Sequence, residues 1–454
     1  MVQIKNPSTT IDGYALSDSI NFDIVEGEHV ALLGGVATGK TTLLKLLAGR
    51  LPVLSGSITV YDLGKISDGA YVFQKENVAF VSFDLQFLNA DSYYQQRFNS
   101  EDAIEQPTLS DFFKNAERND YFENIISLLG LTELLLCPLI TLSSGQMRKS
   151  LIARALLCRP KLLLLDNPFA GLDAKARDLL KELLRDICDS VNLTLVLACS
   201  RISELPSHVR KIVELPYRYD YNNTKNVSFT SSAFIGANFN TAVEFKNVCV
   251  SYGEKVVLDN ISFAIRQGEK WALLGSNGVG KSTIMSLIYG DHPQAYANEI
   301  ILFDRTRGSG ESIWDIKKHI GYCSPELHAY FHEPLSCFDV ITTGLNNNFI
   351  PKKNLNPEER DFINQLLKYY GAESLSKRNF LRISSGEQRL ILLLRAFSRN
   401  ADMLILDEPF QCFDDNLVEA SKSLIDTLIS SKTLLFTSHY KAELPESIGN
   451  ILNL

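Results

Sequence analysis

Short runs of apolar residues recur along this chain, and each ends at a glycine or at an acidic residue. Residues 30–33 stop at Gly34, and residues 161–166 and 403–407 each stop at an aspartate. Runs of this length without polar alternation are typical of buried parallel strands. Longer stretches of helical character lie between them. This alternation predicts an α/β fold in which helices cover a mostly parallel sheet.

Helices are predicted after several of these strands and turns. The clearest are residues 41–48, directly after the first glycine-rich turn, and residues 147–157 and 388–397. Residues 86–140 are also predicted to be helical and polar. They include an aromatic stretch at residues 93–98, to which no role is assigned.

The first half of the chain is repeated in the second half at a nearly constant distance. Residues 2–6 resemble residues 243–247, and landmark residues recur 241 positions later. These pairs are Lys40 and Lys281, Gly145 and Gly386, and Asp166 and Asp407. A constant distance indicates tandem duplication of one domain with few net insertions. We therefore predict two domains of common fold, residues 1–216 and 242–454.

A segment rich in Asn, Ser, Thr and aromatic residues and poor in charge separates the two halves. We predict that residues 217–241 form a linker. A flexible chain of about 25 residues spans roughly 25 to 30 Å, which is long enough to join two lobes lying face to face. Tethering also makes the association of the lobes an intramolecular event.

Composition narrows the class of protein. The 454 residues are 45% hydrophobic and 22% charged, as in globular proteins, and a net charge of −8 argues against a large nucleic-acid surface. The eight cysteines form no C-x-x-C pair, as expected for buried thiols in a reducing compartment.

No apolar segment approaches the roughly 18 to 20 residues that cross a bilayer. Because the repeat begins at residue 2, we expect a cytoplasmic protein; a mitochondrial location without a recognisable presequence is the alternative.

Two glycine-rich turns have the pattern G-x-x-x-x-G-K-[ST], and each stands between a predicted strand and a predicted helix. In this pattern backbone N–H groups surround phosphate oxygens, the lysine neutralises their charge and the hydroxyl reaches Mg²⁺. A turn without a ligand is the alternative for one match, but two matches in the same context predict two nucleotide sites. The residues expected to bind ATP are Gly34, Gly39, Lys40, Thr41, Thr42, Gly275, Asn277, Gly278, Gly280, Lys281, Ser282 and Thr283.

Each half also has polar residues at the end of a buried strand, but the two pairs differ. The second half has Asp407 and Glu408, whereas the first half has Asp166 and Asn167. An aspartate here binds Mg²⁺, and a following glutamate activates the attacking water. We therefore predict a catalytic base at Glu408 and no equivalent base in the first half. The predicted Mg²⁺ ligands are Thr41, Asp166, Ser282 and Asp407.

Serine and glycine residues precede a predicted helix about 20 residues before each acidic strand. Hydroxyls at the start of a helix are, in isolation, N-caps. Their repeated position before the acidic strands favours a shared role in the nucleotide sites. These signature residues are Ser143, Ser144, Gly145 and Gln146 in the first half, and Ser384, Ser385 and Gly386, followed by Glu387, in the second.

Together these motifs resemble those of the ABC-type ATPases over the whole chain. The resemblance adds aspartate loops at residues 170–173 and 411–414 and a switch histidine at His439. It implies two P-loop domains, each with a mostly parallel sheet and a helical subdomain. It also implies that the signature helix of one half caps the γ-phosphate of ATP held by the other half. Residues 290–294, 314–322 and 324–328 are similar to the ModF type, named in bacteria for molybdate transport or photorepair and with fungal relatives.

The chain departs from the family pattern at two further positions. The adenine-stacking aromatic fits Tyr252, although core packing is the alternative for a tyrosine in such a run. The equivalent residue in the first half is Ile11, with Tyr14 nearby. The family glutamine that contacts Mg²⁺ and relays to a membrane partner has no clean match. Its nearest candidates are residues 84–86 and Glu326, which weakens the expectation of a transporter.

The switch histidine also distinguishes the halves. Aligning residues 443–445 with residues 204–206 places Ser200 opposite His439. The first half has thus lost its histidine as well as its glutamate, while its phosphate-binding Lys40 remains. We expect a first site that holds ATP without hydrolysing it well.

These observations predict a twin ABC ATPase that binds two Mg·ATP between its lobes and hydrolyses mainly one, with Glu408 and His439 as catalytic residues. Hydrolysis is expected to drive conformational change in a protein partner that the sequence does not identify. One alternative is the ATP-hydrolysing subunit of a molybdate-like membrane transporter. Another is a ribosome- or nucleic-acid-associated ATPase, although the charge-poor linker differs from the long charged linkers of translation-associated twin ATPases.

Overall fold

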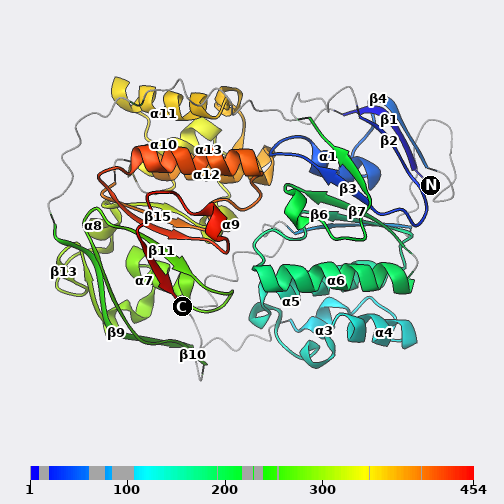
Figure 1. Ribbon diagram of the computed structural model, residues 1–454, viewed down its shortest axis with the longest axis horizontal. Coiled ribbons are helices and arrows are strands. Elements are labelled where there is room, and N and C mark those ends of the chain that lie inside the picture. The colour runs from blue at the N-terminus through cyan, green and yellow to red at the C-terminus, as the bar shows by residue number, and fades with distance from the viewer. Residues whose placement is uncertain are drawn as a thin grey trace. The chain divides into compact units, whose positions relative to one another are not determined.

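The computed structural model describes residues 2–9, 20–60, 77–83, 107–191, 193–216, 229, 239–252, 255–346, 348–399 and 401–454. The chain divides into two compact units, Met1–Arg218 and Tyr219–Leu454 (Figure 1). The aromatic stretch at residues 93–98 and most of the predicted linker lie outside the described residues.

The first unit contains a parallel five-stranded sheet and an antiparallel three-stranded sheet. Its strands are β1 (Val2–Ser8), β2 (Asn21–Ile24), β3 (Val30–Leu33), β4 (Ser55–Val60), β5 (Val78–Ser82), β6 (Leu162–Asp166), β7 (Thr194–Cys199) and β8 (Lys211–Glu214). Its helices are α1 (Lys40–Leu47), α3 (Leu109–Phe112), α4 (Asp120–Leu128), α5 (Ser144–Leu156) and α6 (Ala174–Val191). The parallel sheet has the order β5-β6-β7-β3-β8, and the antiparallel sheet has the order β2-β1-β4.

The second unit repeats this plan. Its strands are β9 (Thr241–Tyr252), β10 (Lys255–Arg266), β11 (Lys270–Leu274), β12 (Glu299–Leu302), β13 (Arg305–Thr306), β14 (Ile320–Cys323), β15 (Met403–Asp407), β16 (Thr433–Thr437) and β17 (Asn450–Asn453). Its helices are α7 (Lys281–Tyr289), α8 (Ile313–Lys317), α9 (Pro325–Tyr330), α10 (Cys337–Asn346), α11 (Pro357–Tyr369), α12 (Ser385–Ser398) and α13 (Asp415–Leu428). The parallel order β14-β15-β16-β11-β17 is equivalent to that of the first unit, and the antiparallel order is β10-β9-β12-β13. The predicted α/β fold is confirmed.

Both faces of the first parallel sheet are buried, which explains its uninterrupted apolar strands. On β6, Leu162 and Leu164 pack with α1 and the antiparallel sheet, while Leu163 and Leu165 pack with α3 to α6 (Figure 1). The long helix α6 buries one face and exposes the other. Among the described helices, none is both long enough and apolar enough to cross a membrane.

The two parallel sheets differ by a two-residue shift next to the acidic strands. Asp166 pairs with Ala198, and Asp407 pairs with Thr437. The separation in sequence between equivalent residues therefore falls from 241 residues at the aspartates to 239 residues at their strand partners. This shift is the one by which the sequence alignment placed Ser200 opposite the switch histidine.

The helical regions of the two units differ around an equivalent backbone bridge. Thr108 bridges to Pro138, 30 residues away, whereas Ser336 bridges to Asn379, 43 residues away. The longer span in the second unit includes the ten-residue helix α10, but α3 has only four residues. The nearly constant distance in the sequence therefore conceals one change in length before Thr108 and an opposite change between the two bridged residues.

Candidate functional site

Each glycine-rich turn joins a buried strand to the first turn of a helix. The turn after β3 ends at Gly39, the N-cap of α1, and the turn after β11 ends at Gly280, the N-cap of α7. Their φ angles are 93° and 105°, which glycine adopts readily and other residues do not. A Cβ atom at Gly280 would also lie 2.6 Å from a methyl group of Leu258. Glycine is therefore needed where the turn meets the helix.

The lysines of the two turns are buried at the first position of α1 and α7. Each ammonium group donates hydrogen bonds to two carbonyl oxygens of its own turn, at 2.5 and 2.7 Å for Lys40 and at 2.7 and 2.9 Å for Lys281. A phosphate oxygen in the turn would be a stronger, charged acceptor for the same group. The other predicted ATP-binding residues lie in these turns and first helical turns: Gly34, Gly39, Thr41, Thr42, Gly275, Asn277, Gly278, Gly280, Ser282 and Thr283.

The predicted Mg²⁺ ligands come together in pairs. Thr41 Oγ1 donates to Asp166 Oδ2 at 2.7 Å, and Ser282 Oγ donates to Asp407 Oδ2 at 3.3 Å. Burial, and then the charge of Glu408, raises the pKa of Asp407 to about 7. A divalent cation would stabilise the ionised aspartate, and hard oxygen atoms are the ligands that Mg²⁺ prefers. The residues present therefore fit a Mg²⁺ ion in each unit.

Two side chains hold the carboxylate of Glu408. His439 Nε2 lies 2.7 Å from Glu408 Oε1, and the side-chain amide of Gln411 donates to Oε2. Arg389 donates in turn to the amide oxygen of Gln411. Burial favours the neutral acid, but the adjacent imidazole of His439 and the hydrogen bond from Gln411 hold the pKa of Glu408 below its usual value. The carboxylate of Glu408 is therefore held in a fixed orientation. A base that accepts a proton from water needs such an orientation.

Thr437 supports the backbone at the same point. Its hydroxyl donates to Asp407 Oδ1 at 2.5 Å and accepts the N–H of Glu408 at 2.9 Å. Glu408 has a φ angle of 44°, in the left-handed region. This conformation costs roughly 1 to 2 kcal/mol for a residue with a Cβ atom, and such strain concentrates at functional sites. Thr437 therefore helps to keep a strained residue in place beside the aspartate.

The first unit has different side chains at all four equivalent positions. Asn167 replaces Glu408, Ser200 replaces His439, Ala198 replaces Thr437 and Ala170 replaces Gln411. Asn167 keeps the left-handed backbone, with a φ angle of 49°, which asparagine tolerates well. Its N–H donates to the carbonyl oxygen of Ala198 at 3.0 Å, and its amide lies 3.4 Å from Asp166 Oδ1. The backbone geometry is retained, but an amide cannot accept a proton from water.

Three contributors to the second site were missed by sequence reasoning. Gln411 lies three residues after Glu408, inside the predicted aspartate loop, and its replacement by Ala170 was a signal available in the repeat. Arg389 has the counterpart Arg148, which donates instead to the backbone carbonyls of residues 168 and 170. Thr437 required the strand register, because the two-residue shift separates it from its counterpart in a fixed alignment.

The signature serines begin helices by capping them. Ser143 forms a capping box with Gln146 at the start of α5, and Ser384 forms one with Glu387 at the start of α12. The Glu387 carboxylate accepts from both the N–H and the hydroxyl of Ser384 at 2.8 Å and lies 3.6 Å from Arg378. The N-cap alternative therefore holds for these two serines. Contacts of Ser144, Gly145, Ser385 and Gly386 with a nucleotide stay a prediction.

The structure describes two of the remaining predicted positions, Tyr252 and Glu326, and leaves the others outside its described residues. Tyr252 is the last residue of β9, and its hydroxyl lies 2.7 Å from His292 Nε2. Glu326 lies on α9, and its charge contributes to the raised pKa of the neighbouring aspartate of β15. Ile11, Tyr14 and residues 84–86 lie outside the described residues.

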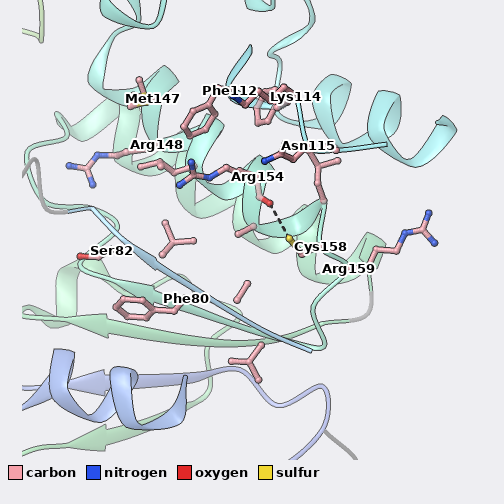
Figure 2. A pocket seen from close by; sticks show the side chains of 18 of the residues that line it. Phe80, Ser82, Phe112, Lys114, Asn115, Met147, Arg148, Arg154, Cys158 and Arg159 are labelled. Atoms are coloured by element: carbon pink, nitrogen blue, oxygen red, sulfur yellow. Dashed lines mark hydrogen bonds between the residues drawn. The ribbon is translucent and has the colours of Figure 1, made fainter. Parts of the chain in front are cut away.

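A groove of about 1210 Å³ opens in the first unit between β5 and the helices α3 to α5 (Figure 2). Figure 2 shows Phe112 and Arg154 on the helical side of the groove, and Phe80 and Ser82 on the sheet side. Four of its arginines lie over aromatic rings, with guanidinium carbons 4.2 to 5.2 Å from the ring centres. Its charged lining residues are Lys45, Arg50, Lys114, Arg148, Arg154 and Arg159, with Asp111 and Glu117. The groove is therefore predominantly basic in an acidic chain.

In the second unit a helix covers the equivalent arginine. Arg395 is buried, and it donates to Thr343 Oγ1 of α10 at 2.8 Å and to the carbonyl oxygen of Asn348 at 3.2 Å. Helix α3 of the first unit ends at Phe112, and Arg154 remains exposed. The basic groove thus follows from the shorter helix.

Comparisons with known proteins agree with the repeated motifs. The ABC transporter family profile matches residues 17–170 and 258–411. The chain is 32% identical to the ABC transporter ATP-binding protein ModF of Escherichia coli, over 94% of this chain and 91% of ModF. It is 30% identical to an uncharacterized ABC transporter ATP-binding protein of Schizosaccharomyces pombe, over 99% of this chain and 96% of that protein. Its fold is similar to that of the archaeal ribosome recycling factor aABCE1, with a TM-score of 0.55 at 18% identity over 99% of this chain and 87% of that one.

Proposed function

The chain belongs to the ABC transporter family as a tandem ATP-binding protein similar to ModF, and we propose that it binds two Mg·ATP and hydrolyses mainly one. The observation that carries this proposal is the unequal surroundings of Glu408 and Asn167. His439 and Gln411 hold the carboxylate, whereas Asn167 has neither partner. Both units keep the phosphate-binding lysine and the paired hydroxyl and aspartate, so binding is expected at both sites.

We assign separate roles to the residues of the second site. Lys281 neutralises charge on the phosphates, and Mg²⁺, which Ser282 and Asp407 would hold, supplies further charge stabilisation when bound. Glu408 orients the attacking water and accepts its proton, and His439 keeps the carboxylate in position. In the first site, the Asn167 amide can orient a water molecule without accepting its proton.

We further propose that each site is completed by the opposite domain, with residues 1–216 and 242–454 as the domains and residues 217–241 as their linker. Gly386 then caps the site of Lys40, and Gly145 caps the site of Lys281. Family membership supports this pairing, as do the helix N-termini of α5 and α12, which favour anionic groups. Small-angle scattering of Glu408→Gln should show compaction when Mg·ATP is added. An unchanged radius of gyration would refute closure.

Steady-state phosphate release by two lysine variants tests the inequality of the sites. Lys281→Ala removes the phosphate-binding group of the hydrolysing site, so turnover should fall nearly to background. Lys40→Ala should lower turnover less, because it weakens only the first site, which is expected to hold ATP without hydrolysing it well. Equal losses in the two variants would contradict the proposal.

We also propose that the basic groove of the first unit binds an acidic segment of the protein partner on which ATP-driven closure acts. The groove is predominantly basic, so an acidic segment would have the opposite charge. Aromatic rings also hold four of its guanidinium groups in place along the groove. The names of the relatives include transporter, which favours a membrane partner over a ribosomal one.

Purification from the native cell tests this assignment by comparing three forms of the chain. The partner should co-purify with the wild type and with Arg185→Glu, an exposed substitution on α6, but not with Arg50→Glu/Arg154→Glu. Integral membrane proteins lost in this pattern would support the transporter alternative, and ribosomal proteins would support the other. A partner that binds all three forms equally does not use the groove.

A further inference from the structure

The segment after α7 holds the end of β9 through two side-chain amides. Gln294, in the short helix η6 (Pro293–Ala297), donates to the carbonyl oxygen of Ser251 at 2.7 Å and accepts its N–H at 3.3 Å. Asn298 makes the same pair with Cys249, at 3.0 and 2.8 Å. The two amides therefore satisfy the strand edge as a neighbouring strand would. This fixes the backbone immediately before Tyr252.

His292 holds the side chain of Tyr252 itself. The imidazole is 1% exposed, and its Nδ1 accepts the N–H of Gln294 at 3.2 Å. An accepting Nδ1 places the ring proton on Nε2, which donates to the Tyr252 oxygen at 2.7 Å. The two rings stand edge to face, 5.8 Å apart at 71°. Tyr252 is therefore fixed in orientation as well as in position.

The residues before His292 anchor the segment on α8. Asp291 pairs with Lys317 at 2.5 Å, and Lys317 also lies 4.3 Å from the ring centre of Tyr289. Gly290 ends α7 with a φ angle of 86°, and a Cβ atom there would lie 3.0 Å from Ile313. Residues 290–294, which the sequence singled out without a role, thus form a rigid support for the end of β9.

We propose that His292 and Gln294 are positioning residues that set Tyr252 against the adenine of ATP in the second unit, and so govern affinity for the base rather than for the phosphates. The inference rests on the proposed function, because it takes the turn before Lys281 as an ATP site. In the first unit Leu51 and Val53 occupy the equivalent positions, and neither side chain can make these hydrogen bonds. This base support is therefore a further difference between the two sites.

Binding of two probes to the full chain separates the roles. The variants carry Lys40→Ala to weaken the first site, and dissociation constants are measured for Mg·ATP and for Mg²⁺ with inorganic tripolyphosphate, which lacks a base. Tyr252→Ala should weaken ATP binding about five- to a hundredfold through lost stacking. Tyr252→Phe and His292→Ala each remove the same hydrogen bond and should weaken it about three- to tenfold. The double variant Tyr252→Phe/His292→Ala should lose no more than either single one.

Tripolyphosphate should bind equally to all variants, and melting without nucleotide checks their folding. Because His292 is buried, Tyr252→Phe carries the test alone if His292→Ala does not fold. Unchanged ATP binding in Tyr252→Phe alongside weakened binding in Tyr252→Ala would refute the positioning role and leave the proposed function standing. A parallel loss of tripolyphosphate binding would mean that these residues serve only the fold. If no variant binds ATP more weakly, Tyr252 does not contact the base.

Discussion

At the end of β15 the carboxylate of Glu408 lies between His439 and Gln411, whereas at the end of β6 the amide of Asn167 lies beside Asp166. The backbones around them are nevertheless alike. Residues in the left-handed region recur in both units: Gly39 and Gly280 at 93° and 105°, Gly130 and Gly371 at 64° and 62°, Asn167 and Glu408 at 49° and 44°, and Gly171 and Cys412 at 71° and 67°. The first unit thus keeps the backbone positions of the proposed catalytic site, although its side chains there are different.

The replaced residues form one connected group. Glu408 contacts His439, Gln411 and Thr437, and each of these partners is replaced along with it in the first unit. Once the carboxylate is absent, groups that orient it or relieve its backbone strain have no further role there. The phosphate-binding lysines donate hydrogen bonds to carbonyl oxygens of their own turns, and they are retained. Loss of hydrolysis without loss of binding is therefore the expected consequence.

The largest expected effect comes from Glu408→Gln. Removing the proton acceptor should lower steady-state phosphate release about 10²- to 10⁴-fold while ATP binding persists. The matched control is Asn167→Gln, which leaves an amide at the first site and should change turnover little. If Glu408→Gln keeps most of the activity, the two units do not differ in the way described.

His439→Ala should have the next largest effect. The carboxylate would remain but lose the ring that lies 2.7 Å from it, and groups that orient a reactive side chain are typically worth about 10- to 100-fold. Ser200→Ala is the matched change in the first unit, and its turnover should equal that of the wild type. Equal rates in the two variants would show that the histidine has no part in the asymmetry.

Gln411→Ala copies the first unit at a single position and should have a smaller effect. One hydrogen bond to Glu408 is lost, which corresponds to about a two- to tenfold fall in turnover. Ala170→Gln in the first unit, where Asn167 has no carboxylate to receive the bond, should change nothing. A loss as large as that of Glu408→Gln would instead point to a direct contact of Gln411 with the nucleotide.

The smallest expected effect is that of Asn167→Glu. The new carboxylate would meet Ser200, Ala170 and Ala198, none of which can hold it as the second site holds Glu408. We expect no second hydrolysing site, and a loss of unfolding free energy of roughly 1 kcal/mol, because glutamate tolerates the left-handed backbone less well than asparagine. Adding Ser200→His, Ala198→Thr and Ala170→Gln should bring measurable hydrolysis in a Glu408→Gln background. A gain from Asn167→Glu alone would show that the partners are dispensable.

The sequence was informative wherever a function depends on residues close together in the chain. The turns ending at Lys40 and Lys281, the mostly parallel sheet and the contrast between Asn167 and Glu408 were predicted in this way. Contacts between distant residues were not, because packing decides them. His292 meets Tyr252 across 40 residues.

Length changes that cancel were equally hidden. The shortening of α3 relative to α10 leaves the distance between the repeats unchanged, so no simple comparison of the two halves reveals the groove. Its basic residues lie on or just after α1, α3 and α5, and only folding brings them together.

Single-turnover hydrolysis with both sites filled tests the central claim most directly. The protein is loaded with γ-labelled ATP at a stoichiometry of two per chain, the unbound nucleotide is diluted with unlabelled ATP, and labelled phosphate is followed by rapid quench. A fast phase should release half of the bound label, while the other half stays as ATP or is released much more slowly. Glu408→Gln should abolish the fast phase without reducing the amount of ATP bound. Release of all bound label in one phase would contradict the proposal that mainly one of the two sites hydrolyses ATP.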